Sequence, residues 1–343
     1  MYKLNFYLEN DPMKILNQFF ILCCLVLLNI SCDQNRTTKI PVIFDSDTNN
    51  ELDDQNALAY LLFNQQVFDI KGITTCATYN GGDIDSHYNE AVRVVKLCDQ
   101  EGKVNVIKGA NKDFNQIKNS IDKEVFDGYE AVDFIISEAK KIQGEKLQIC
   151  AVGKLTNIAL ALLKAPEIES KIKVIWLGSN YPDKGEYNQE NDIPSVNFVL
   201  NTHVEFEMLP CRYGELTGTD GVKIYKATIQ EKIAGLGVQL DHKIKGRDGG
   251  TYSNFGDYAV TLFKNAEYYL DPPSHALFDM VTVAIMKNPN WGKQTVLPAP
   301  IISGQEWVDR PNNSRKIILW ENYDADKMIK DFFTTLKHPH LNE

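Results

Sequence analysis

An acidic turn between an apolar strand-like run and a helix-like run constrains this chain more than any other feature. Residues 41–63 read PVIFDSDTNNELDDQNALAYLLF. Pro41 to Phe44 form a short apolar run typical of a buried strand, and from Asp54 onward apolar residues recur at helical spacing. The sequence therefore predicts a buried strand that runs directly into a helix.

The turn itself is dense in oxygen ligands. Five carboxylates fall within ten residues, and two asparagines add amide oxygens: Asp45, Asp47, Glu51, Asp53, Asp54, Asn49 and Asn50. So many negative charges at one strand end repel one another unless a cation neutralises them. Hard cations such as calcium prefer an all-oxygen shell of this kind. A calcium site at the carboxyl end of a strand in an open α/β sheet is the interpretation that we favour.

Two other interpretations of this stretch explain less. A solvated acidic turn that caps the helix would account for Asp53 or Asp54, but not for Asp45 and Asp47 at the end of an apolar strand. An EF-hand loop fits part of the carboxylate spacing. It lacks the turn glycine, however, and Asn56 stands at the twelfth position, where a bidentate glutamate is expected.

Strand-like and helix-like segments alternate along the rest of the chain, as in α/β proteins. We expect strands at 70–76, 104–109, 147–152, 173–178, 204–210 and 295–302. We expect helices near 91–98, 129–141, 153–168, 193–202, 281–287 and 324–336. Residues 211–256 are richer in Gly, Lys and Thr and show little periodicity, which indicates a lid or insertion over the site. Within it, Tyr252, Phe255 and Tyr258 are candidates for stacking on a planar base.

Four motifs in order resemble those of the inosine-uridine preferring nucleoside hydrolase family. DSDTNNELDDQNA, from Asp45, resembles D-x-D-P-G-x-D-D-A, but it is two residues longer and lacks Pro-Gly. GKLTNIA, from Gly153, matches G-x-L-T-N-[IL]-A, and EYNQEND, from Glu186, resembles E-F-N-x-x-x-D. In the fourth, Asp279 begins a helix, and Phe278 replaces the histidine that usually precedes this aspartate.

The resemblance covers nearly the whole chain after residue 32. It implies an α/β fold, with an open, mostly parallel (mixed) sheet and helices on both faces. It also implies a hydrolase that cleaves the N-glycosidic bond of ribonucleosides to free base and ribose, with calcium as cofactor. The family's metal ligands map onto Asp47, Asp54, the backbone carbonyl of Val152, and Asp279. Asp47 would also be the general base for a metal-activated water.

The same resemblance assigns the sugar-binding positions. Ribose hydroxyls would be bound by Asp53, Asn80, Glu186 and Asn188, and Asp45 would support the loop from behind. Phe278 cannot protonate a departing base and is itself a stacking candidate. Either His275, one turn earlier, or a lid tyrosine is the acid, or the substrate has a better leaving group than inosine.

Three other functions remain open. The chain could keep the fold and the calcium but only bind a ribosyl ligand, or it could hydrolyse a different N- or O-riboside. The run Phe44-Asp45-Ser46-Asp47 also suggests a phosphohydrolase of the haloacid dehalogenase type, which the other three motifs fit poorly.

Charge and the amino-terminal segment bear on partners and location. A net charge of −10 and a pI near 5.2 argue against nucleic acid as a partner and leave a small nucleoside as the expected one. We expect the natural start at Met13, a signal segment within residues 1–32, and a lipid on Cys32. The protein would then be an exported lipoprotein, periplasmic or at the cell surface, that touches the membrane only through this lipid. Residues 33–343 would form one domain, with homo-oligomerisation left open.

Overall fold

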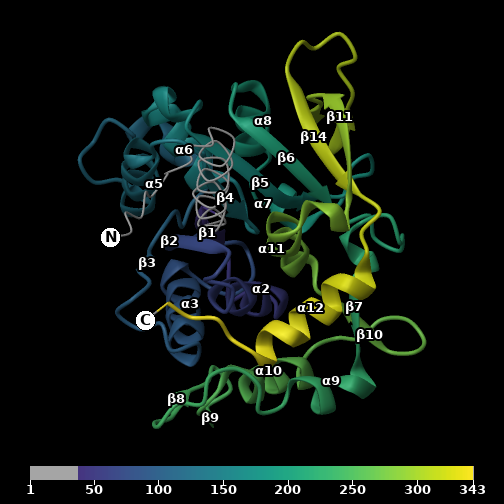
Figure 1. Ribbon diagram of the computed structural model, residues 1–343. Helices are drawn as coiled ribbons and strands as arrows, with labels where there is room; N and C mark the ends of the chain where they lie inside the picture. The colour runs from purple at the N-terminus through teal and green to yellow at the C-terminus, as the bar shows by residue number, and fades with distance from the viewer. Residues whose placement is uncertain (1–37, 343) are drawn as a thin grey trace, which may run out of the picture. The chain divides into compact units, whose positions relative to one another are not determined.

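The computed structural model, which describes residues 38–342, is built on an eight-stranded sheet (Figure 1). In spatial order its strands are β11 (Lys293–Pro298), β14 (Lys316–Glu321), β6 (Glu205–Pro210), β5 (Ile172–Ser179), β4 (Leu147–Ala151), β1 (Ile40–Ser46), β2 (Phe68–Thr75) and β3 (Val106–Ile107). All neighbouring strands run parallel except β11 and β14. The mixed, mostly parallel sheet expected above is therefore confirmed.

Both faces of the sheet are buried because successive side chains of the central strands enter two different hydrophobic cores. In β1, Val42 and Phe44 belong to one core, whereas Ile43 between them belongs to the other. In β5, Ile175 belongs to the first of these cores and Val174 to the second. This is why these strands read as unbroken apolar runs in the sequence.

Helices cover each face (Figure 1). The first core is closed by α2 (Asp53–Leu62), α3 (Ile84–Leu97), α10 (Phe255–Lys264), α11 (Phe278–Lys287) and α12 (Ala325–Lys337). The second is closed by α4 (Phe114–Ile117), α5 (Tyr129–Lys141), α6 (Thr156–Lys164) and α8 (Ile193–Asn201). Helix α5 coincides with the predicted segment 129–141. Lys39–Glu343 forms one compact unit.

Smaller elements fill the connections. They are α7 (Tyr187–Asn191), β7 (Lys223–Tyr225), α9 (Lys226–Ile233), β8 (Ile244–Lys245), β9 (Thr251–Tyr252), β10 (Ser274–Ala276), β12 (Ile301–Ser303), β13 (Glu306–Val308) and four short 3-10 turns, of which Thr219–Gly221 lies beside the cavity described below. The strand expected over 295–302 is divided into β11 and β12. β11 ends at Pro298, and Ala299 and Pro300 separate it from β12; proline has no N–H for a strand ladder.

Residues 1–37 and 343 are not described, so the expected signal segment and Cys32 lie outside the described part of the chain. Among residues 38–342, no helix is both long enough and apolar enough to cross a bilayer.

Candidate active site

A cavity of about 440 Å³ opens at the carboxyl ends of β1, β4 and β5. In open α/β sheets ligands bind at this edge. One group of lining residues is acidic or polar: Asp47, Asn50, Glu51, Asp53, Asp54, Glu186, Asn188 and Asp279. A second group is largely apolar or aromatic and comes from the loop after β6 and the segment that leads into α11, including Tyr213, Tyr269, Leu270 and Phe278. The cavity thus joins a charged region to an apolar one.

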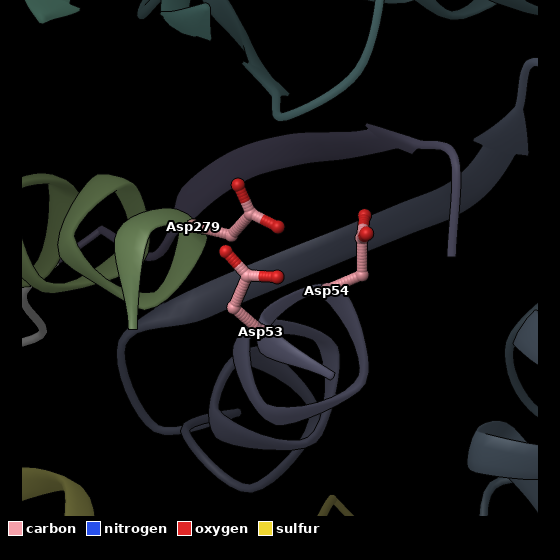
Figure 2. A group of neighbouring side chains, drawn as sticks. All are labelled: Asp53, Asp54 and Asp279. Carbon is pink, nitrogen blue, oxygen red and sulfur yellow. The ribbon is translucent and has the colours of Figure 1, made fainter. Parts of the chain in front are cut away.

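Three buried carboxylates, Asp53, Asp54 and Asp279, form what we call the carboxylate cluster. One oxygen from each lies within 4.8 Å of the other two. Asp53 and Asp54 are the first residues of α2, and Asp279 is in the first turn of α11, a helix that packs on α2. Figure 2 shows the three side chains turned toward one another from these two helices.

The charge of the cluster is not compensated by any basic side chain within the described residues. Burial raises the pKa of all three carboxyls well above the ordinary value, and neighbouring carboxylates add to the effect. Ser46 Oγ donates a hydrogen bond to Asp54 (2.6 Å). No lysine, arginine or histidine within residues 38–342 forms an ion pair with any of the three. An all-oxygen, uncompensated donor set of this kind fits a hard divalent cation.

Asp47 lines the same cavity but is not a member of the cluster. Thr78 Oγ1 donates to its Oδ2 (2.6 Å), and His87 Nδ1 lies 2.7 Å from its carbonyl oxygen. A carbonyl oxygen only accepts, so the imidazole is the donor of this bond. Burial raises the pKa of Asp47 to about 7, and the charges of Asp45 and Glu51 contribute. Thr78 and His87 were not predicted, since no local sequence pattern marks partners 31 and 40 residues away.

Asp45 lies behind the cavity and not in its lining. Its Oδ2 accepts hydrogen bonds from Thr74 Oγ1 (2.5 Å) and Asn157 Nδ2 (2.8 Å). Burial raises its pKa to about 6. These contacts join β1 to β2 and to the start of α6, so the Asn of the GKLTN motif holds the strand that carries the acidic turn.

The glycine of that motif is required by close approach. A Cβ atom at Gly153 would lie 2.7 Å from Cys76 Sγ and 3.2 Å from Asp47 Oδ1. The preceding residue, Val152, lines the cavity, and its carbonyl oxygen accepts a hydrogen bond from Asn188 Nδ2 (3.0 Å). A larger residue at position 153 would therefore push apart two sides of the site.

Glu186 and Asn188 are held on the first turn of α7 and line the cavity. Glu186 caps the helix, since its Oε2 accepts the Gln189 N–H (2.7 Å), and burial raises its pKa to about 8. The Oδ1 atom of Asn188 is buried and has no hydrogen-bond partner among the described residues. An unpaired buried acceptor beside a cavity is suited to a ligand hydroxyl.

Several predicted residues lie elsewhere. Asn80 is exposed and outside the lining, and its N–H donates to the Tyr187 hydroxyl (2.9 Å). Phe255 and Tyr258 are buried in the core face of α10. Tyr252 bonds through its hydroxyl to Asp248 (2.6 Å), and none of these three aromatic residues lines the cavity.

The aromatic lining comes from other positions. Phe278 packs edge-to-face against Tyr213, with ring centroids 5.8 Å apart. Tyr213 and Tyr269 were missed because they lie in loops without periodic patterning. Of the expected lid, residues 211–223 contribute to the lining, whereas the stretch from α9 to β9 does not.

His275 lines the cavity, is nearly fully buried, and has its Nδ1 atom 2.7 Å from the carbonyl oxygen of Ala276. The carbonyl can only accept, so the proton is on Nδ1. A neutral imidazole in this tautomer has no proton on Nε2. Nε2 of His275 is therefore an acceptor in the neutral ring and a donor only in the imidazolium form.

Comparison with known proteins gives consistent results. The family model for "Inosine-uridine preferring nucleoside hydrolase" matches residues 42–330. An uncharacterized protein of Schizosaccharomyces pombe is 34% identical over 87 residues, a match that spans 23% of this chain and 28% of that protein.

Solved structures match over most of their length. A plant nucleoside hydrolase superimposes with a TM-score of 0.65 at 15% identity, covering 88% of this chain and 99% of that one. The inosine-uridine preferring nucleoside hydrolase of Bacillus anthracis superimposes with a TM-score of 0.61 at 16% identity, covering 87% of this chain and 99% of that one. For the purine-preferring ribonucleoside hydrolase of Gardnerella vaginalis the TM-score is 0.60 at 21% identity, and the match covers 87% of this chain and 98% of that one. These likenesses establish the fold. Since the family model spans most of the sequence, the chain belongs to the inosine-uridine preferring nucleoside hydrolase family, a family of hydrolases that act on N-glycosyl compounds.

Proposed function

We propose that the protein hydrolyses the N-glycosidic bond of ribonucleosides to free base and ribose, and that the reaction depends on calcium. The observation that carries the proposal is the carboxylate cluster: three buried acidic groups within 4.8 Å, at a cavity, without a cationic partner among the described residues. Family membership supports the reaction class.

The residues that would hold calcium are Asp47, Asp54, Asp279 and the Val152 carbonyl, with Asp53 in the same group of oxygens. A bound divalent cation lowers the pKa of a coordinated water and so supplies a nucleophile near neutral pH. Asp47 would accept the proton of that water as general base. Because Thr78 occupies Oδ2 of Asp47, Oδ1 is the oxygen left for this transfer.

Glu186 and Asn188 would bind the ribose hydroxyls. The free Oδ1 of Asn188 can accept a hydroxyl proton, and the Glu186 carboxyl is fixed by the α7 amide that it caps. Attack from the face opposite the base gives inversion at the anomeric carbon. The nearby carboxylates stabilise the positive charge that develops on the sugar as the bond to the base breaks.

The proposal is tested by the release of reducing sugar from a panel of purine and pyrimidine ribonucleosides, with and without a calcium chelator. We expect release that the chelator abolishes and that added calcium restores. Absence of release from every nucleoside, with calcium still bound, would favour a ribosyl-binding protein or another riboside as substrate.

We further propose that the protein is exported and lipid-anchored at Cys32, on the basis of the sequence of residues 13–32. Metabolic labelling with a radioactive fatty acid is the test. The wild-type chain should take up label and the Cys32→Ser variant should not.

A further inference from the structure

A half-buried ion pair in the cavity lining, Lys223 with Asp220, has no role in the proposed hydrolysis so far. Lys223 is the one lysine or arginine among the described residues that line the cavity. Its Nζ atom lies 3.1 Å from Asp220 Oδ2, and the two side chains are only 18% and 14% exposed. Asp220 also accepts the Gly214 N–H (2.8 Å), so the carboxylate is fixed to the loop after β6. This pair is too enclosed to be a solvated surface pair.

Strand pairing fixes Lys223 relative to the carboxylate cluster. Lys223 lies directly opposite Ala276 in the antiparallel pair of β7 and β10, and directly opposed residues share one face. Ala276 lines the cavity, and the next residue, Leu277, donates its N–H to the Val222 carbonyl (2.9 Å). The same short segment continues into Asp279. The position of the ammonium is therefore tied to the helix start that supplies one of the three carboxylates.

Other donors in the apolar lining are already engaged or absent. Phe278 has none, and His275 Nδ1 donates to the Ala276 carbonyl (2.7 Å). The Tyr269 hydroxyl bonds to Glu267 (3.3 Å), and Tyr213 contacts the Cys211 thiol. An ammonium has three N–H donors, of which Asp220 takes one. Lys223 therefore retains donors for a ligand.

We propose that the Lys223–Asp220 pair binds the departing base and that Lys223 protonates it. The inference rests on the proposed function and adds the group that activates the leaving base. As the water oxygen bonds to C1′, the C1′–N bond breaks and its electron pair leaves with the base. Lys223 gives a proton to a ring nitrogen or carbonyl oxygen of the base, and Asp47 takes one from the water. Transfer of one proton from Asp47 to Lys223 through solvent restores both groups.

The test compares two leaving groups. Inosine loses a base that departs more readily when protonated, whereas 4-nitrophenyl β-D-riboside loses a phenolate that needs no proton. In Lys223→Gln we expect kcat for inosine to fall about 10²-fold with KM little changed, and kcat for the aryl riboside to fall less than about threefold. Lys223→Arg, which keeps a cationic donor, should recover part of the inosine activity.

Two further variants serve as controls. Lys223→Met with Asp220→Asn leaves no unpaired carboxylate at this half-buried position, so it should fold even if the single variant does not. It should show the same selective loss. Lys327→Gln removes a lysine that is also paired with an aspartate three residues earlier, Asp324, but lies outside the cavity lining. It should match the wild-type protein on both substrates.

Two results would overturn the role of Lys223 without affecting the proposed function. One is an equal loss of kcat on the two substrates. The other is inosine turnover within about threefold of wild type in both Lys223→Gln and the Lys223→Met/Asp220→Asn double variant. A wild-type protein that hydrolyses the aryl riboside but not inosine would also overturn it. If the wild-type protein hydrolyses neither, the proposed function itself fails.

Discussion

Two consecutive residues of α2 contact two buried acidic groups that differ in whether neighbouring side chains compensate their charge. Asp54 belongs to the carboxylate cluster, whereas the amide of Gln55 donates to the fully buried Glu90 (3.2 Å). Glu90 also accepts hydrogen bonds from the Arg93 guanidinium and the Tyr258 hydroxyl. We call these four side chains the Glu90 network. Glu90 thus receives donors and a cation from the chain, whereas the carboxylate cluster receives no cation from residues 38–342.

The difference separates a structural element from a binding site. A buried carboxylate is tolerated when donors and an opposite charge surround it, as they do for Glu90. Two unit charges 4.8 Å apart, the span of the cluster, repel by roughly 3 kcal/mol at an effective dielectric constant of about 20. The cluster therefore has to hold either protons or a cation, whereas the Glu90 network needs neither.

The largest effect is expected on the cavity side. Asp47→Ala should lower kcat for the preferred nucleoside by about 10³-fold or more, because no carboxylate then takes the proton of the attacking water. The fold should be retained, since the hydrogen bond from His87 is to the backbone carbonyl of residue 47. Steady-state kinetics and circular dichroism are the measurements. Unchanged turnover would refute the mechanism.

In the Glu90 network the loss should be of stability. Arg93→Leu leaves Glu90 buried without its cation, so we expect the free energy of unfolding to fall by about 3 kcal/mol. Urea titration measures this. The double variant Arg93→Leu/Glu90→Gln should recover most of the loss, and calcium should still raise the Tm of both variants. A loss below about 1 kcal/mol would mean that solvent compensates Glu90 after all.

In the carboxylate cluster, removal of one charged group should raise the free energy of unfolding instead of lowering it. Asp279→Asn removes one of three uncompensated charges, so the calcium-free protein should gain about 2 kcal/mol of stability at pH 8. Calcium should no longer raise its Tm. Glu90→Gln is the matched control, and it should lose stability while keeping the calcium effect. A destabilised Asp279→Asn variant that still responds to calcium would show that the cluster is not the calcium site.

Local sequence patterns predict the helices and strands better than they predict which side chains contact the site residues. The acidic turn and α5 follow from local patterns, and the structure brings Asp54 and Asp279 together although they are far apart in the chain. Thr78 and His87 reach Asp47 only through the packing of the segment after β2, which no local pattern encodes.

The aromatic stacking candidates illustrate the opposite case, in which a signal was present. Phe255, Tyr258, Ala259 and Leu262 recur at helical spacing, and all are buried in α10. The helical spacing therefore indicated core positions for these rings, and it was a better guide than their ability to stack on a base. Tyr213 and Tyr269, which do line the cavity, lie in loops whose course depends on the strands that they connect.

The smallest expected effect is on pH dependence. Burial raises the pKa of Asp47 from 3.8 to about 7, so between these values the folded protein holds a proton that the unfolded chain releases. Well below pH 3.8 Asp47 is protonated in both states and costs nothing, whereas its contribution to stability falls as the pH rises toward 7 and then levels off. From pH 6 to pH 7 the titration of Asp47 alone should cost the calcium-free protein about 1 kcal/mol of stability, and the raised pKa values of the carboxylate cluster act in the same direction. Because calcium replaces these protons, it should raise the Tm more at pH 7.5 than at pH 5. Scanning calorimetry at the two pH values measures this. Equal shifts would indicate that calcium binds away from the buried carboxylates, as it would at an exposed acidic surface whose groups are ionised at both values.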